Sequence, residues 1–361
     1  MTVQTIPGIL GIDDSERTYI ETVGQQSVWE ATQQYVQMVN EDLARITNLF
    51  IEKTTEDHKF RYYLPADGEL QRVSKRGVPA ERKVAGSWNV ALPLEGFGDA
   101  VSWQRRDIAY MTLRDYQRAV EGVVLRAQNT LRKEILRALL DNVGYTFPDE
   151  LRGDLSCVPL ANGDSVLYPP KAGAATAATA THYIETNYAT ASITDTNNPI
   201  KTISRALRGR FASNGAQRRR VILVASGAQD YIEALTDFEP VDDPNIKKGV
   251  NSDQVLNVPV SIPGEVIGYC NEAYVAVWEW MPANYMIGID LLAEKPLQMR
   301  VDPGYTNLPR GLALVTESDQ FPITKSNWEW WMGLGVVNRL NGYVAELGTG
   351  GTYSVPSDYS H

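Results

Sequence analysis

The sequence predicts an α+β fold, because strand-like and helix-like segments follow one another in mixed order without a regular βαβ rhythm. A long amphipathic segment starts at Thr112 and runs to about Gly144 without a proline, which is typical of a helix that organises a domain. Residues 60–104, just before it, consist of short alternating runs broken by glycine and proline, the pattern of a β-ribbon. At roughly 150 residues per domain, a chain of 361 residues corresponds to about two to three domains.

The N-terminal region is expected to be an arm followed by a helix. Residues 1–26 mix glycine, proline and charged residues without a hydrophobic period, which indicates extended chain. A helix is expected from Ser27 to about Lys53, because Ser27 and Glu30 match the Ser-x-x-Glu capping box. The apolar residues that recur at helical spacing in this segment are Val28, Tyr35, Val39, Leu43, Ile46 and Phe50.

The β-ribbon has a turn at Asp67-Gly68 and little apolar mass of its own. A two-stranded ribbon is marginally stable in isolation, so we expect this one to lie on another surface. The ribbon carries five basic side chains within a span of twelve positions: Arg72, Lys75, Arg76, Arg82 and Lys83.

The segment after Thr112 is the clearest element of the sequence, with Asp115 placed to complete a helix cap. Roughly 30 residues at 1.5 Å each make a rod of about 45 Å. The residues expected on its apolar face are Leu113, Tyr116, Val120, Val123, Val124, Ala127, Leu131, Ile135 and Ala138. Those on the opposite, basic face are Arg114, Arg118, Arg126, Lys133 and Arg137.

The second half of the chain contains short strands and helices. A low-complexity loop is expected at 171–181, and a short helix after Asn198-Pro199. A buried-type strand, RRRVILVAS, leads directly into a helix, GAQDYIEALTDF. The remaining expected strands lie within 258–270, 274–282, 285–292, 297–303 and the aromatic stretch 327–347, and a polar tail follows.

Composition excludes several classes of protein. Hydrophobic residues make up 43% and charged residues 22%, which excludes a disordered chain. No apolar run reaches 18 residues and the N-terminus lacks a secretory pattern, so neither a membrane span nor a signal peptide is expected. Two cysteines, Cys157 and Cys270, provide no disulfide framework, so folding in a reducing compartment is the default expectation.

Charge is distributed unevenly along the chain. The net charge of −10 argues against a dedicated nucleic-acid reader. Residues 1–58 hold 3 basic and 10 acidic side chains, a balance of −7, whereas residues 59–137 hold 15 basic and 9 acidic, a balance of +6. Either these are unrelated solvated surfaces, or the acidic and basic segments meet, for example between copies of the chain.

Motifs for catalysis or cofactor binding are missing. The sequence has three histidines but no His-x-x-x-His or Cys-x-x-Cys pair, no Walker loop and no Gly-x-Ser-x-Gly elbow. Ser226 follows a strand but lacks the preceding glycine, because Val224 occupies that position. We therefore expect no enzyme activity, no cofactor and no metal.

The tryptophans are expected to serve packing. Trp278 and Trp280 would share one strand face, as would Trp328 and Trp330. Such large rings fit a core or a subunit contact better than a platform for sugars or bases.

The order of these parts resembles the major capsid protein of tailed double-stranded DNA phages, which has the Hong Kong 97-type fold. The segments that carry the resemblance are MTLRDYQRAVEGVVLRAQNTLRKEILRALLDN as a spine helix, FRYYLP to NVALPL as an extended loop, RRRVILVASGAQDYIEAL and AYVAVWEWMPANYMIGID as apical elements, and WEWWMGLGVVNRLNGYVAEL as closing strands. The implied organisation is an N-terminal arm with helix (1–56), an extended β-loop (57–105), a peripheral domain (106–182 and 318–347), an apical domain (183–317) and a C-terminal tail (348–361).

The resemblance implies a subunit that self-assembles into hexamers and pentamers of an icosahedral head shell. Its partners would be other copies of itself, packaged DNA through weak nonspecific contact, and scaffold, portal and decoration proteins, with no membrane. It would be assembled in the host cytoplasm and reside in the virion. Arg72, Lys75, Arg76, Arg82 and Lys83 are the expected intersubunit contacts. A non-viral nanocompartment shell of the same fold and, more remotely, a carbohydrate-active enzyme remain as alternatives.

Some members of this family weld their shells with an isopeptide bond between a loop lysine and an asparagine, assisted by a glutamate. The residues of this chain that fit those roles are Lys75 or Lys83, Asn338 and Glu346.

Overall fold

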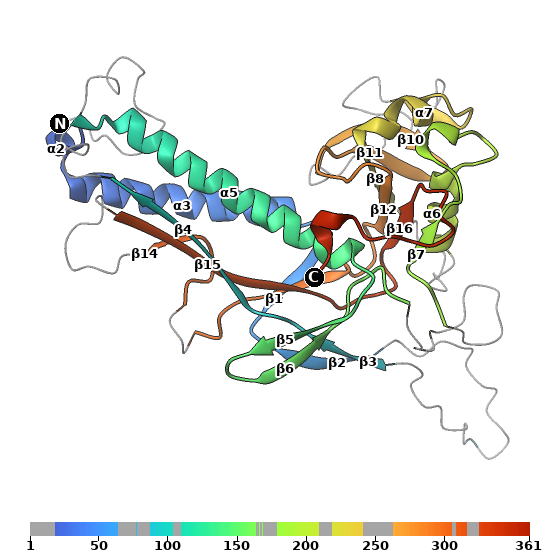
Figure 1. Cartoon of the computed structure of the whole chain (residues 1–361), viewed down its shortest axis with the longest axis horizontal. Coiled ribbons are helices and arrows are strands. Elements are labelled where there is room, and N and C mark those ends of the chain that lie inside the picture. Colours follow the sequence, from blue (N-terminus) through green and yellow to red (C-terminus); the bar gives the residue numbers. More distant parts are fainter. Residues whose placement is uncertain are drawn as a thin grey trace.

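The computed structural model describes residues 19–63, 77, 87–103, 110–163, 166, 168, 179–208, 219–240, 263–304, 308–315 and 325–361. These residues form an elongated molecule with two lobes (Figure 1). One lobe combines two long helices with a five-stranded sheet, and the other is built on a seven-stranded sheet. No described helix is both long enough and apolar enough to span a membrane.

The elements follow the chain in mixed order. The helices are α2 (Ile20–Val23), α3 (Gln25–Thr47), α5 (Leu113–Leu140), α6 (Pro199–Arg208) and α7 (Gln229–Glu233), with the short 3₁₀ turns η1 (Thr190–Ser192), η2 (Ser226–Ala228) and η3 (Ser357–Tyr359). The strands are β1 (Ile51–Thr55), β2 (Lys59–Tyr63), β3 (Ser87–Ala91), β4 (Glu95–Ser102), β5 (Tyr145–Asp149), β6 (Gly153–Cys157), β7 (Tyr183–Glu185), β8 (Arg220–Val224), β9 (Phe238–Pro240), β10 (Glu265–Cys270), β11 (Ala273–Val277), β12 (Tyr285–Asp290), β13 (Leu297–Arg300), β14 (Ala313–Val315), β15 (Lys325–Val336) and β16 (Tyr343–Glu346).

The long helix α5 confirms the strongest expectation from the sequence. The Thr112 side chain accepts from the backbone N–H of Asp115, and the Asp115 side chain accepts from the backbone N–H of Thr112, so the capping box is complete. All of the apolar positions expected on one face are buried. That face packs on β15, whose Trp328 and Trp330 are also buried, as expected for core tryptophans.

The first long helix differs from its expected bounds. α3 begins at Gln25, so Ser27 lies exposed inside the helix and does not cap it. It ends at Thr47, earlier than the expected Lys53, because Ile51 starts a strand that pairs with β13 in parallel. Pairing with a strand that is distant in the sequence therefore overrides the local helical period.

The predicted ribbon is only partly a ribbon. β2 and β3 pair antiparallel, from Lys59 opposite Ala91 to Tyr63 opposite Ser87. β4, which we had expected to extend the ribbon, instead pairs along its whole length with β15 in the five-stranded sheet, whose order is β1-β13-β15-β14 with β4 beside β15. The tip of the ribbon, residues 64–76 and 78–86, lies outside the described residues.

The second lobe has the strand order β7-β16-β12-β8-β11-β10-β9. β8 and α6 form where the sequence predicts them, but the helix expected at 227–238 is reduced to η2 and the short α7. Trp278 and Trp280 were expected on one strand face. They lie in the turn after β11, where Trp278 stacks on Phe50 at a ring distance of 5.6 Å and joins the two lobes.

Candidate functional site

The candidate site is the base of the β2–β3 ribbon, because the basic residues expected to contact other subunits lie between these two strands. Those residues, Arg72, Lys75, Arg76, Arg82 and Lys83, lie outside the described part of the chain. What the structure does describe is how the ribbon leaves the body of the molecule and what holds it there.

An aromatic cluster anchors the base of the ribbon. Trp88 on β3 is buried, and its indole Nε1 donates to the Val337 carbonyl at 3.2 Å. Its ring lies 4.9 Å from that of Tyr62 on β2 and 5.6 Å from that of Tyr168. The Tyr62 hydroxyl donates to Glu294, and burial raises the pKa of this phenol. The ribbon therefore starts from a fixed position, which determines the direction in which it leaves the body.

The end of the described ribbon is more exposed than its base. Tyr63 is 61% exposed, and the Arg61 guanidinium lies 5.6 Å from the centroid of the Tyr63 ring. The Arg61 side chain also donates to the Ser87 hydroxyl across the two strands at 2.9 Å. These contacts help keep β2 and β3 paired at the exposed end of the described ribbon.

A buried ion pair fixes the neighbouring β5–β6 hairpin to the sheet. Arg300 on β13 donates to the Asp149 carboxylate at 2.7 Å, and both side chains are buried. Arg300 also donates to the Leu92 carbonyl at 2.9 Å, next to β3. Burial alone would raise the pKa of Asp149, but the hydrogen bonds from Arg300 and from the backbone of Leu151 and Arg152 lower it overall.

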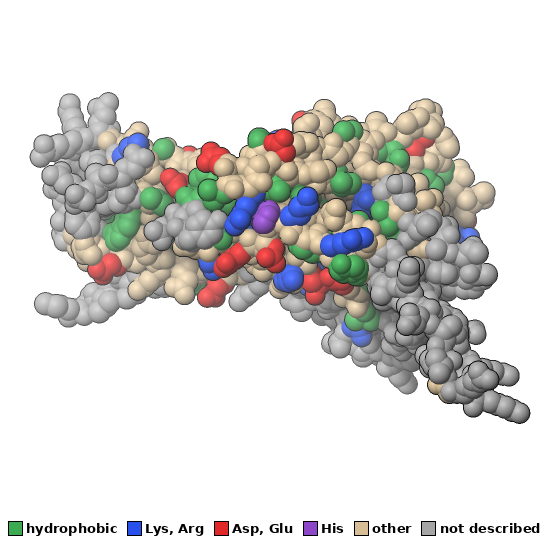
Figure 2. Space-filling view, turned by 90° about the horizontal axis from the view of Figure 1, so that it is seen from below, with side chains coloured by type: hydrophobic (Ala, Val, Ile, Leu, Met, Phe, Trp, Pro, Cys, Tyr) green, Lys and Arg blue, Asp and Glu red, His purple; other side chains and the backbone are tan. Residues whose placement is uncertain are grey.

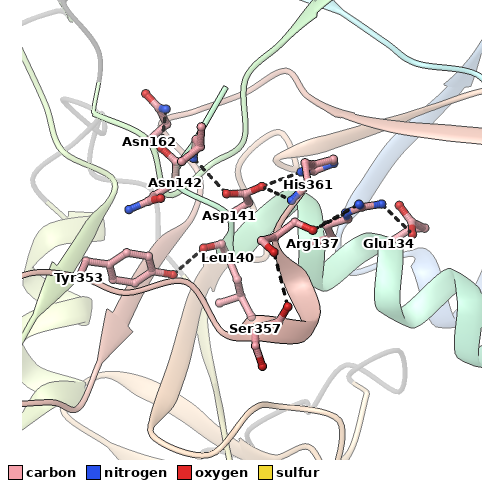
Figure 3. Close-up of polar contacts among 11 residues, drawn as sticks. Glu134, Arg137, Leu140, Asp141, Asn142, Asn162, Tyr353, Ser357 and His361 are labelled. Carbon is pink, nitrogen blue, oxygen red and sulfur yellow. Dashed lines mark hydrogen bonds and ion pairs between the residues drawn. The ribbon is translucent and has the colours of Figure 1, made fainter. Parts of the chain in front are cut away.

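The C-terminal segment packs against the end of α5 (Figure 3). The hydroxyl of Tyr353 donates to the Leu140 carbonyl at 2.6 Å, which satisfies one of the carbonyls left unpaired at the helix end. His361 lies with its Nδ1 atom 2.7 Å from the carboxylate of Asp141, the C-cap residue, and its ring stacks on Tyr145 at 3.6 Å. The expected polar tail is therefore an ordered part of the lobe.

The residues considered for a crosslink each have partners within the chain. Asn338 is buried; its side chain donates to the Glu294 carbonyl at 2.6 Å and accepts from the Leu340 amide at 3.1 Å. The carboxylate of Glu346 accepts from the backbone amide of Ser354 at 2.7 Å. Asn338 follows β15, whereas Glu346 ends β16, and the two lysines are outside the described residues. The crosslink stays a prediction.

The face that carries the two hairpins has mixed charge. Figure 2 shows Lys and Arg side chains interleaved with Asp and Glu along the middle of this face, with hydrophobic side chains between them. One exposed pair joins Arg310 to Glu56 at 2.6 Å. An interleaved surface of this kind favours specific protein contacts over binding of a polyanion.

The described part of the chain offers few groups for metal binding or nucleophilic chemistry. There, no group of three or more His, Cys, Asp or Glu residues could hold a metal ion. Both cysteines are buried, and burial raises the pKa of the Cys157 thiol to about 11. Ser226 begins the turn η2 after β8.

Two structural contacts were missed by sequence reasoning. The Arg300–Asp149 pair joins residues 151 positions apart, and no local pattern marks either of them as buried. The attachment of the C-terminal segment had one usable signal, the aromatic residues Tyr353 and Tyr359 within a stretch otherwise read as polar tail. A buried tyrosine near a helix end is a candidate for satisfying a free carbonyl.

Comparisons with known proteins identify the fold. No protein-family model and no curated protein matches the sequence. Among solved structures, one from Mycobacterium phage Patience matches with a TM-score of 0.67 and 15% identity, over 92% of this chain and 90% of that chain. The capsid structure of the cyanophage P-SCSP1u matches with a TM-score of 0.47 and 8% identity, over 82% and 86% of the two chains.

The likeness to the Patience structure extends over nearly the whole of both chains and confirms the expected fold. The protein has the mixed helix-and-strand fold of that phage structure, in agreement with the α+β class expected from the sequence.

Proposed function

We propose that the protein is a major capsid protein that self-assembles into the icosahedral head shell of a tailed double-stranded DNA phage and encloses the genome. The observation that carries this proposal is the fold, which matches a phage structure over 92% of the chain. The partners are other copies of the chain in hexamers and pentamers, with scaffold, portal and decoration proteins and weakly held DNA as further partners. The protein resides in the virion and is assembled in the host cytoplasm, and its role is structural rather than enzymatic.

The ribbon base supports this proposal by its geometry. Trp88 and Tyr62 hold the base firmly, while the strands lead toward an exposed end at Tyr63. A two-stranded ribbon is marginally stable by itself, so a surface on another copy is a natural place for it to pack. Contacts of this heterologous kind close into rings.

Sedimentation of the purified full-length chain tests the proposal, together with negative-stain imaging of the fast fraction. We expect closed particles of megadalton size. A species that stays monomeric or forms a small oligomer at high protein concentration would overturn the shell function and favour the enzyme alternative. Neighbouring genes decide between the two kinds of shell: terminase and portal genes support the phage head, whereas genes for cargo enzymes support the nanocompartment.

Denaturing electrophoresis of mature particles tests the crosslink separately. If Lys75 or Lys83 joins Asn338 of another copy, bands at multiples of 40.1 kDa will persist in denaturant. Replacement of Asn338 by Asp would then remove those bands. A single band near the monomer mass would exclude the crosslink and leave the shell function untouched.

A further inference from the structure

The helices α3 and α5 present two exposed stripes of opposite charge. On α5 the exposed residues follow one helical stripe: Asp115, Arg118, Leu125, Arg126, Asn129 and Lys133. On α3 the exposed residues among those whose side chains are described also follow one stripe: Gln26, Ser27, Glu30, Gln34, Gln37, Met38 and Glu41. The first stripe holds three cations and one carboxylate, Asp115 at the helix start, whereas the described side chains of the second stripe include two carboxylates, Glu30 and Glu41.

Each stripe also exposes one large apolar side chain near its middle. Leu125 on α5 is 58% exposed and Met38 on α3 is 55% exposed. Isolated exposed apolar residues are ordinary, but here each is flanked by charges that match those of the other helix. An apolar residue at the centre with charges around it is the arrangement expected of a small protein–protein contact.

The charges of the α5 stripe are largely free to meet a partner. Among the described residues, Arg118 and Lys133 make no salt bridge, whereas Arg126 pairs with Asp99 on β4 at 2.6 Å with 59% of its own side chain exposed. On α3, Glu30 accepts one hydrogen bond from Gln26 at 2.8 Å, and a carboxylate has room for further donors. Among the described residues, Arg118 and Lys133 on α5 therefore have no carboxylate partner within 4.0 Å, and Glu30 on α3 has no cationic one.

The surface formed by α3 and α5 suits a second copy of the chain better than it suits a polyanion such as DNA. α3 and α5 lie side by side in the same lobe (Figure 1), and their starts are joined by a hydrogen bond from the Ile20 amide to the Met111 carbonyl at 3.3 Å. α5 holds six basic and three acidic residues, and α3 holds one basic and three acidic residues, so together they carry only +1. A phosphate backbone would meet α3 beside α5 and be repelled by it.

We infer that the exposed stripe of α5 in one copy docks against the exposed stripe of α3 in the neighbouring copy. This inference rests on the proposed shell function and names one of the contacts between neighbours. Because the two helices run in the same direction (Figure 1), a neighbour related by a small rotation brings its α3 roughly parallel to α5. The contact is heterologous, so every copy can use both stripes and the contacts can close into a ring.

The spacing of the residues supports a parallel alignment. A helix rises 1.5 Å per residue, so Glu30 lies about 12 Å before Met38 along α3, and Arg118 lies about 10 Å before Leu125 along α5. When Met38 is placed opposite Leu125, Glu30 and Arg118 are therefore at nearly the same level. Glu41 then lies close to the level of Arg126 and Asn129. The alignment places Arg118 near the level of Glu30 and Arg126 near that of Glu41, while the carboxylate of Asp115 already accepts from the backbone N–H of Thr112 in the helix cap.

A charge swap tests this contact in the full-length protein. Arg118→Glu and Glu30→Arg are each expected to raise the concentration needed for particle formation about tenfold, because each places like charges together at every contact. The double variant, R118E with E30R, restores the opposite charges and is expected to assemble within about twofold of the wild type. The matched control is Arg205→Glu, which makes the same charge change at an exposed position of α6 in the other lobe.

The outcomes separate this inference from the shell function. If wild-type protein forms particles and both single variants form them at the same concentration, the α5–α3 contact is wrong and the shell function stands. A double variant that assembles no better than the single variants would also overturn the contact. Normal assembly of R118E with weaker retention of duplex DNA would assign α5 to the nucleic acid instead. Wild-type protein that remains monomeric would overturn both proposals.

Discussion

The five-stranded and seven-stranded sheets of this protein are covered by other elements to different degrees. In the seven-stranded sheet, β8 and β11 are buried along their whole length. Alternate residues of β8 belong to different hydrophobic clusters. Val221 and Leu223 are part of the cluster that includes the long helices. Ile222 and Val224 are part of the cluster that includes α6. In the five-stranded sheet, β4 alternates between half-buried and exposed residues along its whole length, so one of its faces is solvated.

The difference shows how each lobe is held together. A sheet covered on both faces needs apolar residues at every position and is stabilised by packing. A sheet with an open face buries fewer side chains, so polar contacts between distant segments carry more of its stability. The Arg300–Asp149 pair and the Tyr353–Leu140 hydrogen bond are such contacts.

Removal of the Arg300 side chain is expected to have the largest effect. Arg300→Ala leaves the Asp149 carboxylate buried without its partner, which costs about 3–5 kcal/mol. Urea unfolding of dissociated subunits measures this loss. The double variant Arg300→Met with Asp149→Leu is the control, because replacing both charges with apolar groups should recover most of the stability. A loss below about 1 kcal/mol in Arg300→Ala would contradict the role of the pair.

The same pair makes stability depend on pH. The pKa of Asp149 is lower in the folded chain than its usual value of 3.8, so the folded state favours the carboxylate. Its contribution is fully present above the unfolded pKa and is lost as the pH falls through the lower folded pKa. The urea midpoint is therefore expected to fall below about pH 4. Asp149→Asn should flatten this part of the profile.

Truncation of a buried side chain in the seven-stranded sheet is expected to lower the free energy of unfolding by about 2–5 kcal/mol. Leu223 on β8 is fully buried, so Leu223→Ala leaves a cavity between the sheet and the long-helix core. Val101→Ala on β4 is the matched change in the open sheet, and we expect it to cost under about 1 kcal/mol because Val101 is only half-buried. Equal losses in urea unfolding would remove the contrast between the sheets.

The attachment of the C-terminal segment is expected to contribute less. Tyr353→Phe removes the donor to the Leu140 carbonyl and keeps the ring packing, at a cost of about 1 kcal/mol. Amide exchange should also become faster at residues 353–361. Unchanged exchange there would show that the packing of the segment, rather than this hydrogen bond, holds it on α5.

The exposed Arg126–Asp99 pair is expected to matter least for the stability of one chain. It joins α5 to β4 at 2.6 Å, but the two side chains are 59% and 31% exposed, so Arg126→Ala should cost under about 1 kcal/mol. Thermal unfolding in low salt is the most sensitive measurement, because salt screens such a pair. A loss as large as that in Tyr353→Phe would show that the pair is more desolvated than its exposure indicates.

Helices were predicted better than strand partners. The bounds of α5 agree with the sequence because the capping box and the helical period both act within a few residues. The end of α3 could not be predicted in this way, since Ile51 leaves the helical pattern to pair with Leu297. Strand β4 has the composition of a ribbon strand, and only its register with β15 assigns it to a different sheet.

At the candidate site, too, local features were predictable from the sequence and contacts between distant segments were not. The alternating pattern predicted strands in this region, and β2 and β3 confirm a pair of them. The contact role of the five basic residues between these strands stays a prediction. Sequence reasoning did not find the anchor of the ribbon, since Trp88 donates to a carbonyl that is 249 positions away. Nor did it indicate that Asn338 and Glu346 already have partners within the chain.

The sequence by itself determined the α+β class, the long helix and its apolar face, and the presence of a ribbon. Each of these depends on hydrogen bonds and side-chain periods that span a few residues. The tertiary structure alone decided where α3 stops, which sheet receives β4, and how the C-terminal segment covers the end of α5. These depend on contacts between segments more than a hundred residues apart, which form only when both segments bury their surfaces against the same core.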